Sequence, residues 1–93
     1  MSKYKVSIKS SAQKTFLHLS KEFQQELIDA FLKLSLNPYI RDLSIKKLSG
    51  FKDAYRMRIG RWRVLYNVND KKFIIEIIDI FIHKEENDYR RRL

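Results

Sequence analysis

Four arginines in the middle of the sequence have a spacing that could gather their side chains on one surface. Arg56 and Arg58 are two residues apart, and Arg61 and Arg63 follow with the same spacing. Residues two apart on a β-strand point to the same face of a sheet. Arg63 joins that face if two strands pair through a turn at Gly60 with their apolar residues turned inward. Arg61 then lies at the turn beside the other three.

Clustered guanidinium groups imply an anionic ligand. They repel one another without one, and their planar fork fits two oxygens of a phosphate group. The spacing therefore predicts a phosphate-binding surface formed by Arg56, Arg58 and Arg63. The alternative is a solvent-facing sheet that keeps arginines for solubility and for protection of its edges.

The last part of the sequence contains residues that could transfer protons or contact a base. His83 follows an apolar run over residues 73–82, and Lys84 comes directly after it. Histidine is the side chain whose ordinary pKa lies nearest to neutrality, so His83 is a candidate acid–base group. Tyr89 could stack on an RNA base. The alternatives are a purely structural histidine and a tyrosine that packs the tail onto the core.

Positive charge is concentrated in the same middle region. Residues 37–72 contain ten basic and three acidic residues, and they therefore contribute +7 of the formal net charge of +9. Lys46, Lys47 and Lys52 lie just before the arginines and extend the same field. A localised basic field favours RNA, DNA or an acidic protein as a partner. The alternative is a set of ordinary, solvated surface lysines.

Several other classes of site and location are disfavoured. The sequence has no cysteine, no glycine-rich phosphate loop, and no obvious cluster of metal ligands or pair of catalytic carboxylates. We therefore expect metal-free chemistry without a cofactor. The first residues alternate rather than forming the apolar core of a signal peptide. The longest apolar stretch is too short to span a bilayer. We expect no membrane contact and a cytoplasmic location.

The first half of the sequence predicts two helices. Ser10 or Ser11 is expected to cap a short helix, and Ser20 is expected to cap a longer one. Apolar residues at helical spacing follow Ser20, and Pro38 should end the second helix because the residue before a proline disfavours helical geometry. Together these signals predict an antiparallel helical hairpin over residues 11–36.

The rest of the pattern predicts strands. Residues 4–8, 55–59 and 62–68 alternate between apolar and polar residues, and the β-branched run over residues 72–82 suits a central strand covered on both faces. The predicted fold is α+β, with an antiparallel four-stranded sheet and the N-terminal helical hairpin packed on one face. The element order is β-α-α-β-β-β, and residues 1–93 are expected to form one domain.

These residues together resemble the RelE/ParE toxin superfamily. The family's central segment typically reads Lys-Leu-x-Gly, then Tyr-Arg-x-Arg-x-Gly, then an aromatic residue followed by Arg-Val-x-Tyr. The corresponding stretches of this sequence are Lys47-Leu48-Ser49-Gly50, Tyr55-Arg56-Met57-Arg58-Ile59-Gly60 and Trp62-Arg63-Val64-Leu65-Tyr66. The ending Ile82-His83-Lys84, with Tyr89, is similar to the family's last strand and its basic tail.

The resemblance implies a RelE-like mRNA interferase, which is the toxin of a type II toxin–antitoxin system. Such an endoribonuclease would cleave mRNA on the ribosome without a metal and would inhibit translation, and its partners would be the ribosome, mRNA and a cognate acidic antitoxin. The catalytic residues implied are Arg56, Arg58, Arg63, His83 and Tyr89. The RNA-binding residues implied are Lys46, Lys47, Lys52, Arg61 and Lys84.

Two other functions fit the same resemblance. One is a ParE-like inhibitor of DNA gyrase, and the other is a non-catalytic module that binds RNA or the ribosome. One departure from the family bears on the choice, because some members carry lysines where this sequence has Arg56 and Arg58. Arginine stays charged and is a poor general base. The proton transfers of a nuclease would therefore depend on His83 or Tyr89.

Overall fold

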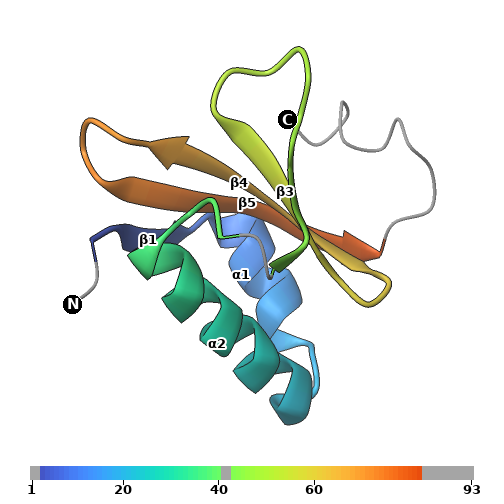
Figure 1. Cartoon of the computed structure of the whole chain (residues 1–93). Helices are drawn as coiled ribbons and strands as arrows, with labels where there is room; N and C mark the ends of the chain where they lie inside the picture. The colour runs from blue at the N-terminus through green and yellow to red at the C-terminus, as the bar shows by residue number, and fades with distance from the viewer. Residues whose placement is uncertain (1–2, 41–42, 83–93) are drawn as a thin grey trace.

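The computed structural model describes residues 3–40 and 43–82. Within these two ranges, two helices and five strands follow one another. They are β1 (Lys5–Ile8), α1 (Ser10–Leu17), α2 (Lys21–Leu36), β2 (Ile45–Lys47), β3 (Ala54–Ile59), β4 (Trp62–Asn69) and β5 (Ile74–Ile82). The strands form one sheet in the order β1-β5-β4-β3-β2, and both helices lie on the same side of it (Figure 1).

The α+β class and the helical layer on one face confirm the prediction, but the sheet differs from it in two details. Its fifth strand, β2, lies where the sequence predicted only a basic loop. This strand has three residues at the sheet edge, and exposed lysines are typical of edge strands, so no apolar pattern marks it. In addition, β1 pairs with β5 in parallel, whereas the other pairs are antiparallel.

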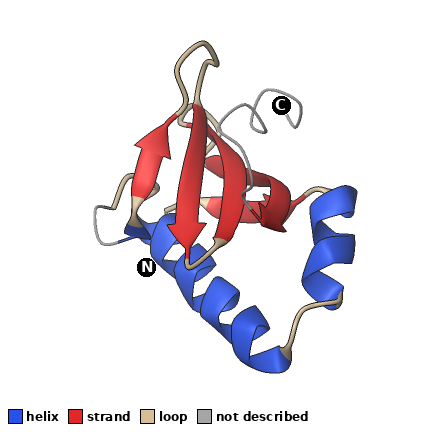
Figure 2. Cartoon of the chain, turned by 90° about the vertical axis from the view of Figure 1, so that its right-hand side faces the viewer, coloured by secondary structure: helices blue, strands red, loops and turns tan. Residues whose placement is uncertain are grey.

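The helix ends follow most of the predicted signals. The Ser20 hydroxyl accepts a hydrogen bond from the backbone N–H of Phe23 at 3.2 Å, which confirms Ser20 as the cap of α2. Helix α2 ends at Leu36, directly before Asn37-Pro38. The predicted serine cap of α1 is wrong, because the helix begins at Ser10 after Lys9, and no side chain caps it. The two helices diverge from the turn between them (Figure 2).

The main core lies between the helices and the sheet. Helix α2 contributes its predicted apolar stripe, and β3, β4 and β5 contribute residues that alternate toward the helices. The buried residues of this cluster are Ala12, Leu27, Ala30, Phe31, Leu34, Met57, Val64, Tyr66, Val68, Ile75, Ile77 and Ile80. Within the part of the chain that the structure describes, no helix is both long and apolar enough to cross a bilayer.

Tyr66 connects the middle of the sheet to the end of α2. Its ring is fully buried, and its hydroxyl donates a hydrogen bond to the carbonyl oxygen of Pro38 at 2.9 Å. Burial raises the pKa of Tyr66, so the phenol stays protonated and keeps donating. The bond holds the chain where α2 gives way to the segment that leads into β2.

We expect Tyr66→Phe to lower the free energy of unfolding by about 1–2 kcal/mol, because the buried carbonyl of Pro38 loses its donor while the ring volume is unchanged. Urea denaturation measures this loss. Tyr55→Phe is the control, since Tyr55 stacks on Tyr66 with ring centroids 5.7 Å apart and keeps that stacking as phenylalanine. Equal unfolding midpoints for the Tyr66→Phe variant and the parent would contradict the assignment.

Candidate nucleic-acid interface

Three of the four central arginines lie on the sheet face that the helices leave uncovered. Strands β3 and β4 pair so that Arg58 is directly opposite Arg63 and Arg56 is opposite Leu65. Cross-strand partners share a face, and residues two apart on a strand do so as well. Arg61 is exposed in the two-residue turn between these strands, where Gly60 has a φ of +58° that suits a glycine.

The pairing of Arg58 with Arg63 has an electrostatic consequence. Like charges placed directly opposite one another destabilise a sheet, so the pair is best stabilised by an anion between them. Arg63 is held in place because its Nη1 donates to the carbonyl oxygens of Gly60 and Trp62, both at 3.0 Å. The Nε atoms of Arg56 and Arg63 are buried and have no hydrogen-bond partner among the described residues.

An irregularity in β5 brings further residues to this face. The register against β4 shifts between Leu65 and Tyr66, so that Leu65 pairs with Asp79 whereas Tyr66 pairs with Ile77. Ile78 is left over as the extra residue of a β-bulge, and such bulges change which face the following side chains take. As a result, Asp79 and Phe81 lie in line with Leu65 and Arg63.

The uncovered face therefore combines an apolar floor with cations. A second small cluster of buried residues forms the floor, namely Leu48, Ala54, Leu65, Ile78 and Phe81, with Phe51 packed against it. One row across the sheet reads Lys46, Arg56, Leu65 and Asp79, and the next reads Arg58, Arg63 and Phe81. The guanidinium groups on this face can bind phosphates, while the buried apolar cluster holds together the strands that carry them.

The sequence did not single out Leu65 or Phe81 as part of a site. The run over residues 74–82 is so uniformly apolar that a period of two cannot be assigned to it, and the bulge changes the phase within it. The alternation in β4 places Leu65 on the same face as Arg63, and this pattern could have identified Leu65 as part of the site.

The other residues implied by the resemblance are distributed unevenly. Lys46 is opposite Arg56 and shares its face, whereas Lys47 is opposite Tyr55 and points to the other face. Lys52 is exposed in the loop before β3 and lies near Asn67 and Glu76, at the opposite end of the sheet from Arg63. His83, Lys84 and Tyr89 lie outside the described residues. The residue before His83, Ile82, pairs with Trp62, so β5 ends beside the arginines.

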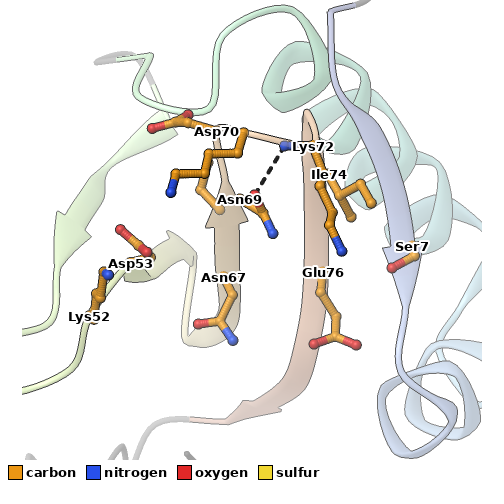
Figure 3. A pocket seen from close by; sticks show the side chains of 11 residues that line it. Ser7, Lys52, Asp53, Asn67, Asn69, Asp70, Lys72, Ile74 and Glu76 are labelled. Carbon is orange, nitrogen blue, oxygen red and sulfur yellow. Dashed lines mark hydrogen bonds between the residues drawn. The ribbon is translucent and has the colours of Figure 1, made fainter.

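A polar groove with a volume of about 700 Å³ lies at the far end of the sheet (Figure 3). It is lined by side chains of the β4–β5 turn and its neighbours, including Lys52, Asp53, Asn67, Lys72 and Glu76. Within residues 3–40 and 43–82, no three histidine or acidic side chains come together in a way that could hold a metal ion.

The family of the chain follows from its sequence. The model of the "ParE toxin of type II toxin-antitoxin system, parDE" matches residues 4–87. The chain belongs to the RelE/ParE family of type II toxins. A comparison with curated proteins finds no significant match.

Solved structures of RelE/ParE toxins share the fold. RelE in the archaeal RelE–RelB complex from Pyrococcus horikoshii is 29% identical, with a TM-score of 0.78 over 86% of this chain and 94% of that one. A chain of the intact E. coli RelBE complex is 21% identical, with a TM-score of 0.75 over 88% and 99%. The YoeB/ParE toxin from Agrobacterium tumefaciens is 15% identical, with a TM-score of 0.75 over 86% and 99%.

Proposed function

We propose that this type II toxin is an endoribonuclease that cleaves mRNA on the ribosome and thereby stops translation in the cytoplasm. The observation that carries the proposal is the position of Arg63 directly opposite Arg58, with Arg56 beside them on the sheet face opposite the helices. Such a pair is stabilised by a phosphate group, and an RNA strand supplies one at every nucleotide. Leu65 and Phe81 are buried beneath this face and hold the strands that carry the arginines together.

The chemistry we propose is an attack of a ribose 2′-OH on its own 3′-phosphate. A bond forms between the 2′-oxygen and phosphorus, and the bond from phosphorus to the 5′-oxygen of the next nucleotide breaks. The 2′-OH loses its proton to a base, and the leaving 5′-oxygen gains one from an acid. Arg56, Arg58 and Arg63 would offset the negative charge that builds up on the phosphorus oxygens.

Arginine does not exchange protons readily, so other residues must supply the acid and the base. We assign a proton-transfer role to His83, with Tyr89 and Lys84 as the next candidates, because the chain reaches them directly after β5 ends beside the arginines. Lys46 shares the face of Arg56 and would bind a neighbouring phosphate, and Arg61 at the turn would do the same. The ribosome would orient the mRNA, so the free protein is expected to cleave slowly.

The decisive experiment is to express the toxin without an antitoxin and to map mRNA 5′ ends and DNA breaks in the same cells. We expect new 5′ ends inside translated reading frames, together with a loss of protein synthesis and no gyrase-linked breaks. Breaks at gyrase sites without mRNA cleavage would instead identify a gyrase inhibitor. That second function is favoured by one observation, the match of the chain to the model of ParE toxins.

An acidic antitoxin is the protein partner that we propose. The solved structure from Pyrococcus horikoshii is a RelE–RelB complex, and the one from E. coli is the intact RelBE toxin–antitoxin complex. Both support an antitoxin as the partner. The surplus of positive charge around Arg56, Arg58 and Arg63 favours an acidic segment that covers this face.

We expect the association rate constant of toxin and antitoxin to fall steeply with salt, because complementary charge acts mainly on the encounter rate. Arg56→Glu with Arg58→Glu should lower this constant by about tenfold or more at low salt. Stopped-flow fluorescence measures it. Lys14→Glu with Lys21→Glu, on the helices, is the matched control. An antitoxin that contacts only the helices and leaves Arg56 and Arg58 open would contradict this assignment.

A further inference from the structure

The turn between β4 and β5 presents an aromatic ring to solvent in a strained backbone conformation. The side chain of Phe73 is 52% exposed, and its φ is +56°. In this left-handed region the Cβ atom crowds the following carbonyl oxygen, and the corresponding position of hairpin turns is usually occupied by glycine or asparagine. Phenylalanine is unfavourable here on both counts. Strained residues that a fold retains are candidates for a functional role.

Neighbouring residues hold this turn and its ring in place. The ring of Tyr4 contacts Phe73 edge-on, with centroids 5.4 Å apart. The hydroxyl of Tyr4 donates to Asp70 Oδ1 at 2.6 Å, and the hydroxyl of Tyr39 donates to both carboxylate oxygens of Asp70 at 3.0 Å. The backbone N–H of Lys5 also donates to the carbonyl oxygen of Phe73 at 2.8 Å. An exposed ring that is already ordered loses little conformational entropy on binding a ligand.

Three exposed lysines neighbour Phe73 in the chain or in the sheet, and two of them, Lys71 and Lys72, line the polar groove. Lys71 and Lys72 precede Phe73 in the turn, Lys5 pairs with the next residue of β5, and all three lysines are exposed. Their side chains add to the field of the polar groove on the uncovered face, where Figure 3 shows Lys52 and Lys72 among the lining residues. An exposed ring with lysines on adjacent residues has the composition of a platform that stacks a base while nearby cations bind phosphates of the same strand.

We propose that Phe73, Lys5, Lys71 and Lys72 form a second RNA-contact surface, separate from the arginines. A base of a single-stranded or loop segment stacks on Phe73, and the lysines bind the flanking phosphates. The surface lies about 20 Å from Arg63, because the six residues from Arg63 to Asn69 each advance about 3.3 Å along β4. It therefore contacts a different nucleotide from the one cleaved. The inference rests on the proposed function only in taking RNA as the ligand.

The groove beside the turn favours RNA over an acidic peptide. Asp53, Asn67 and Glu76 are among the residues that line it (Figure 3). Carboxylates would repel an acidic peptide there, whereas they can accept hydrogen bonds from the N–H groups of bases, including the ring N3–H of uracil. The lysines remain available for phosphates at the rim.

The test is binding of a short, fluorescein-labelled 2′-O-methyl oligouridine, which has no free 2′-OH to react, followed by anisotropy as a function of salt. Phe73→Gly should weaken binding by roughly 5- to 150-fold, the range found when one stacking ring is removed. Glycine suits the positive φ, so this variant should fold at least as well at that position. Phe73→Trp should keep parental affinity or exceed it.

Lys71→Ala with Lys72→Ala should flatten the slope of log affinity against log salt by about 1.4, or 0.7 for each phosphate that a lysine no longer neutralises. Lys14→Ala with Lys21→Ala removes the same charge from the helices and should leave the slope unchanged. Parental affinity of the Phe73→Gly variant would overturn the proposal. The proposal would also be overturned if the Phe73→Gly variant lost binding to an acidic oligoglutamate and kept its binding to the oligouridine.

Cleavage of mRNA on ribosomes, measured with the same variants, separates this proposal from the proposed function. If the parent protein cleaves no mRNA but Phe73→Gly weakens oligouridine binding, the proposed nuclease activity is wrong and the RNA-contact surface stands. If the parent protein cleaves mRNA and Phe73→Gly binds oligouridine as the parent does, only the proposed RNA-contact surface is overturned. Weaker binding of the variant to ribosomes that carry no mRNA would identify ribosomal RNA as the ligand, and weaker binding only to mRNA-loaded ribosomes would identify the message.

Discussion

Arg63→Ala is expected to slow single-turnover cleavage of ribosome-bound mRNA by about a hundredfold to thousandfold, the range typical of losing one charge-stabilising group. Arg63 is half-buried, its partner across the strands is Arg58, and its guanidinium is anchored to two carbonyl oxygens of the β3–β4 turn. It is therefore preorganised, which gives it more effect on a transition state than a mobile surface cation has.

The matched variants separate charge from geometry. Arg63→Lys keeps the positive charge and loses the fork, so it should recover only part of the rate. Lys14→Ala removes a positive charge from α1 and should cleave at the parent rate. Because Arg63 also bonds to Gly60 and Trp62, the melting temperature of each variant must be compared. Parental cleavage by a folded Arg63→Ala variant would remove the arginine from the site.

Binding gives a second readout for the same group. Replacing Arg56, Arg58 and Arg63 together should flatten the salt dependence of RNA affinity by roughly two units of the log–log slope, at about 0.7 for each phosphate that is no longer neutralised. An unchanged slope would show that these arginines do not contact the nucleic acid.

The face shared by these arginines could be predicted from the sequence because period two is unambiguous in β3 and β4. Tyr55, Met57 and Ile59 alternate with Arg56 and Arg58, and only one phase puts the apolar set against the helices. The cap at Ser20 was equally clear, since its signal is local. Both features depend on residues that are close together in the sequence.

The parts that could not be predicted depend on pairing between distant segments. Strand β2 exists because Ile45, Lys46 and Lys47 pair with β3, and one apolar residue followed by two lysines carries no strand signal. The register shift that aligns Asp79 with Leu65 depends on how β5 meets β4. The parallel pairing of β1 with β5 joins residues 5–8 to residues 74–77, and no local pattern specifies it. Periodicity alone also could not separate Lys46 from Lys47, which take opposite faces.

The arginines alone do not complete the proposed reaction. They can bind a phosphate and offset its charge, but a cyclising attack also needs two proton transfers, and a guanidinium cannot supply them at neutral pH. Asp79 lies in the row of Arg56, but one of its oxygens already accepts from the backbone N–H of Ile80 at 2.9 Å. The next titratable side chain along the sequence after Asp79 is His83.

His83→Ala is therefore expected to keep RNA and ribosome affinity near the parent value and to lower the cleavage rate by about a hundredfold to ten-thousandfold, the usual contribution of a positioned proton-transfer group. The measurement is single-turnover cleavage of ribosome-bound mRNA with saturating toxin, which removes binding from the rate. Lys14→Ala is the control, because it removes a charge from α1 without removing an imidazole and should cleave at the parent rate. Arg63→Ala should differ from His83→Ala by weakening binding as well as rate. If His83→Ala cleaves at the parent rate, the histidine is structural, and Tyr89 or Lys84 becomes the next candidate for the proton transfer.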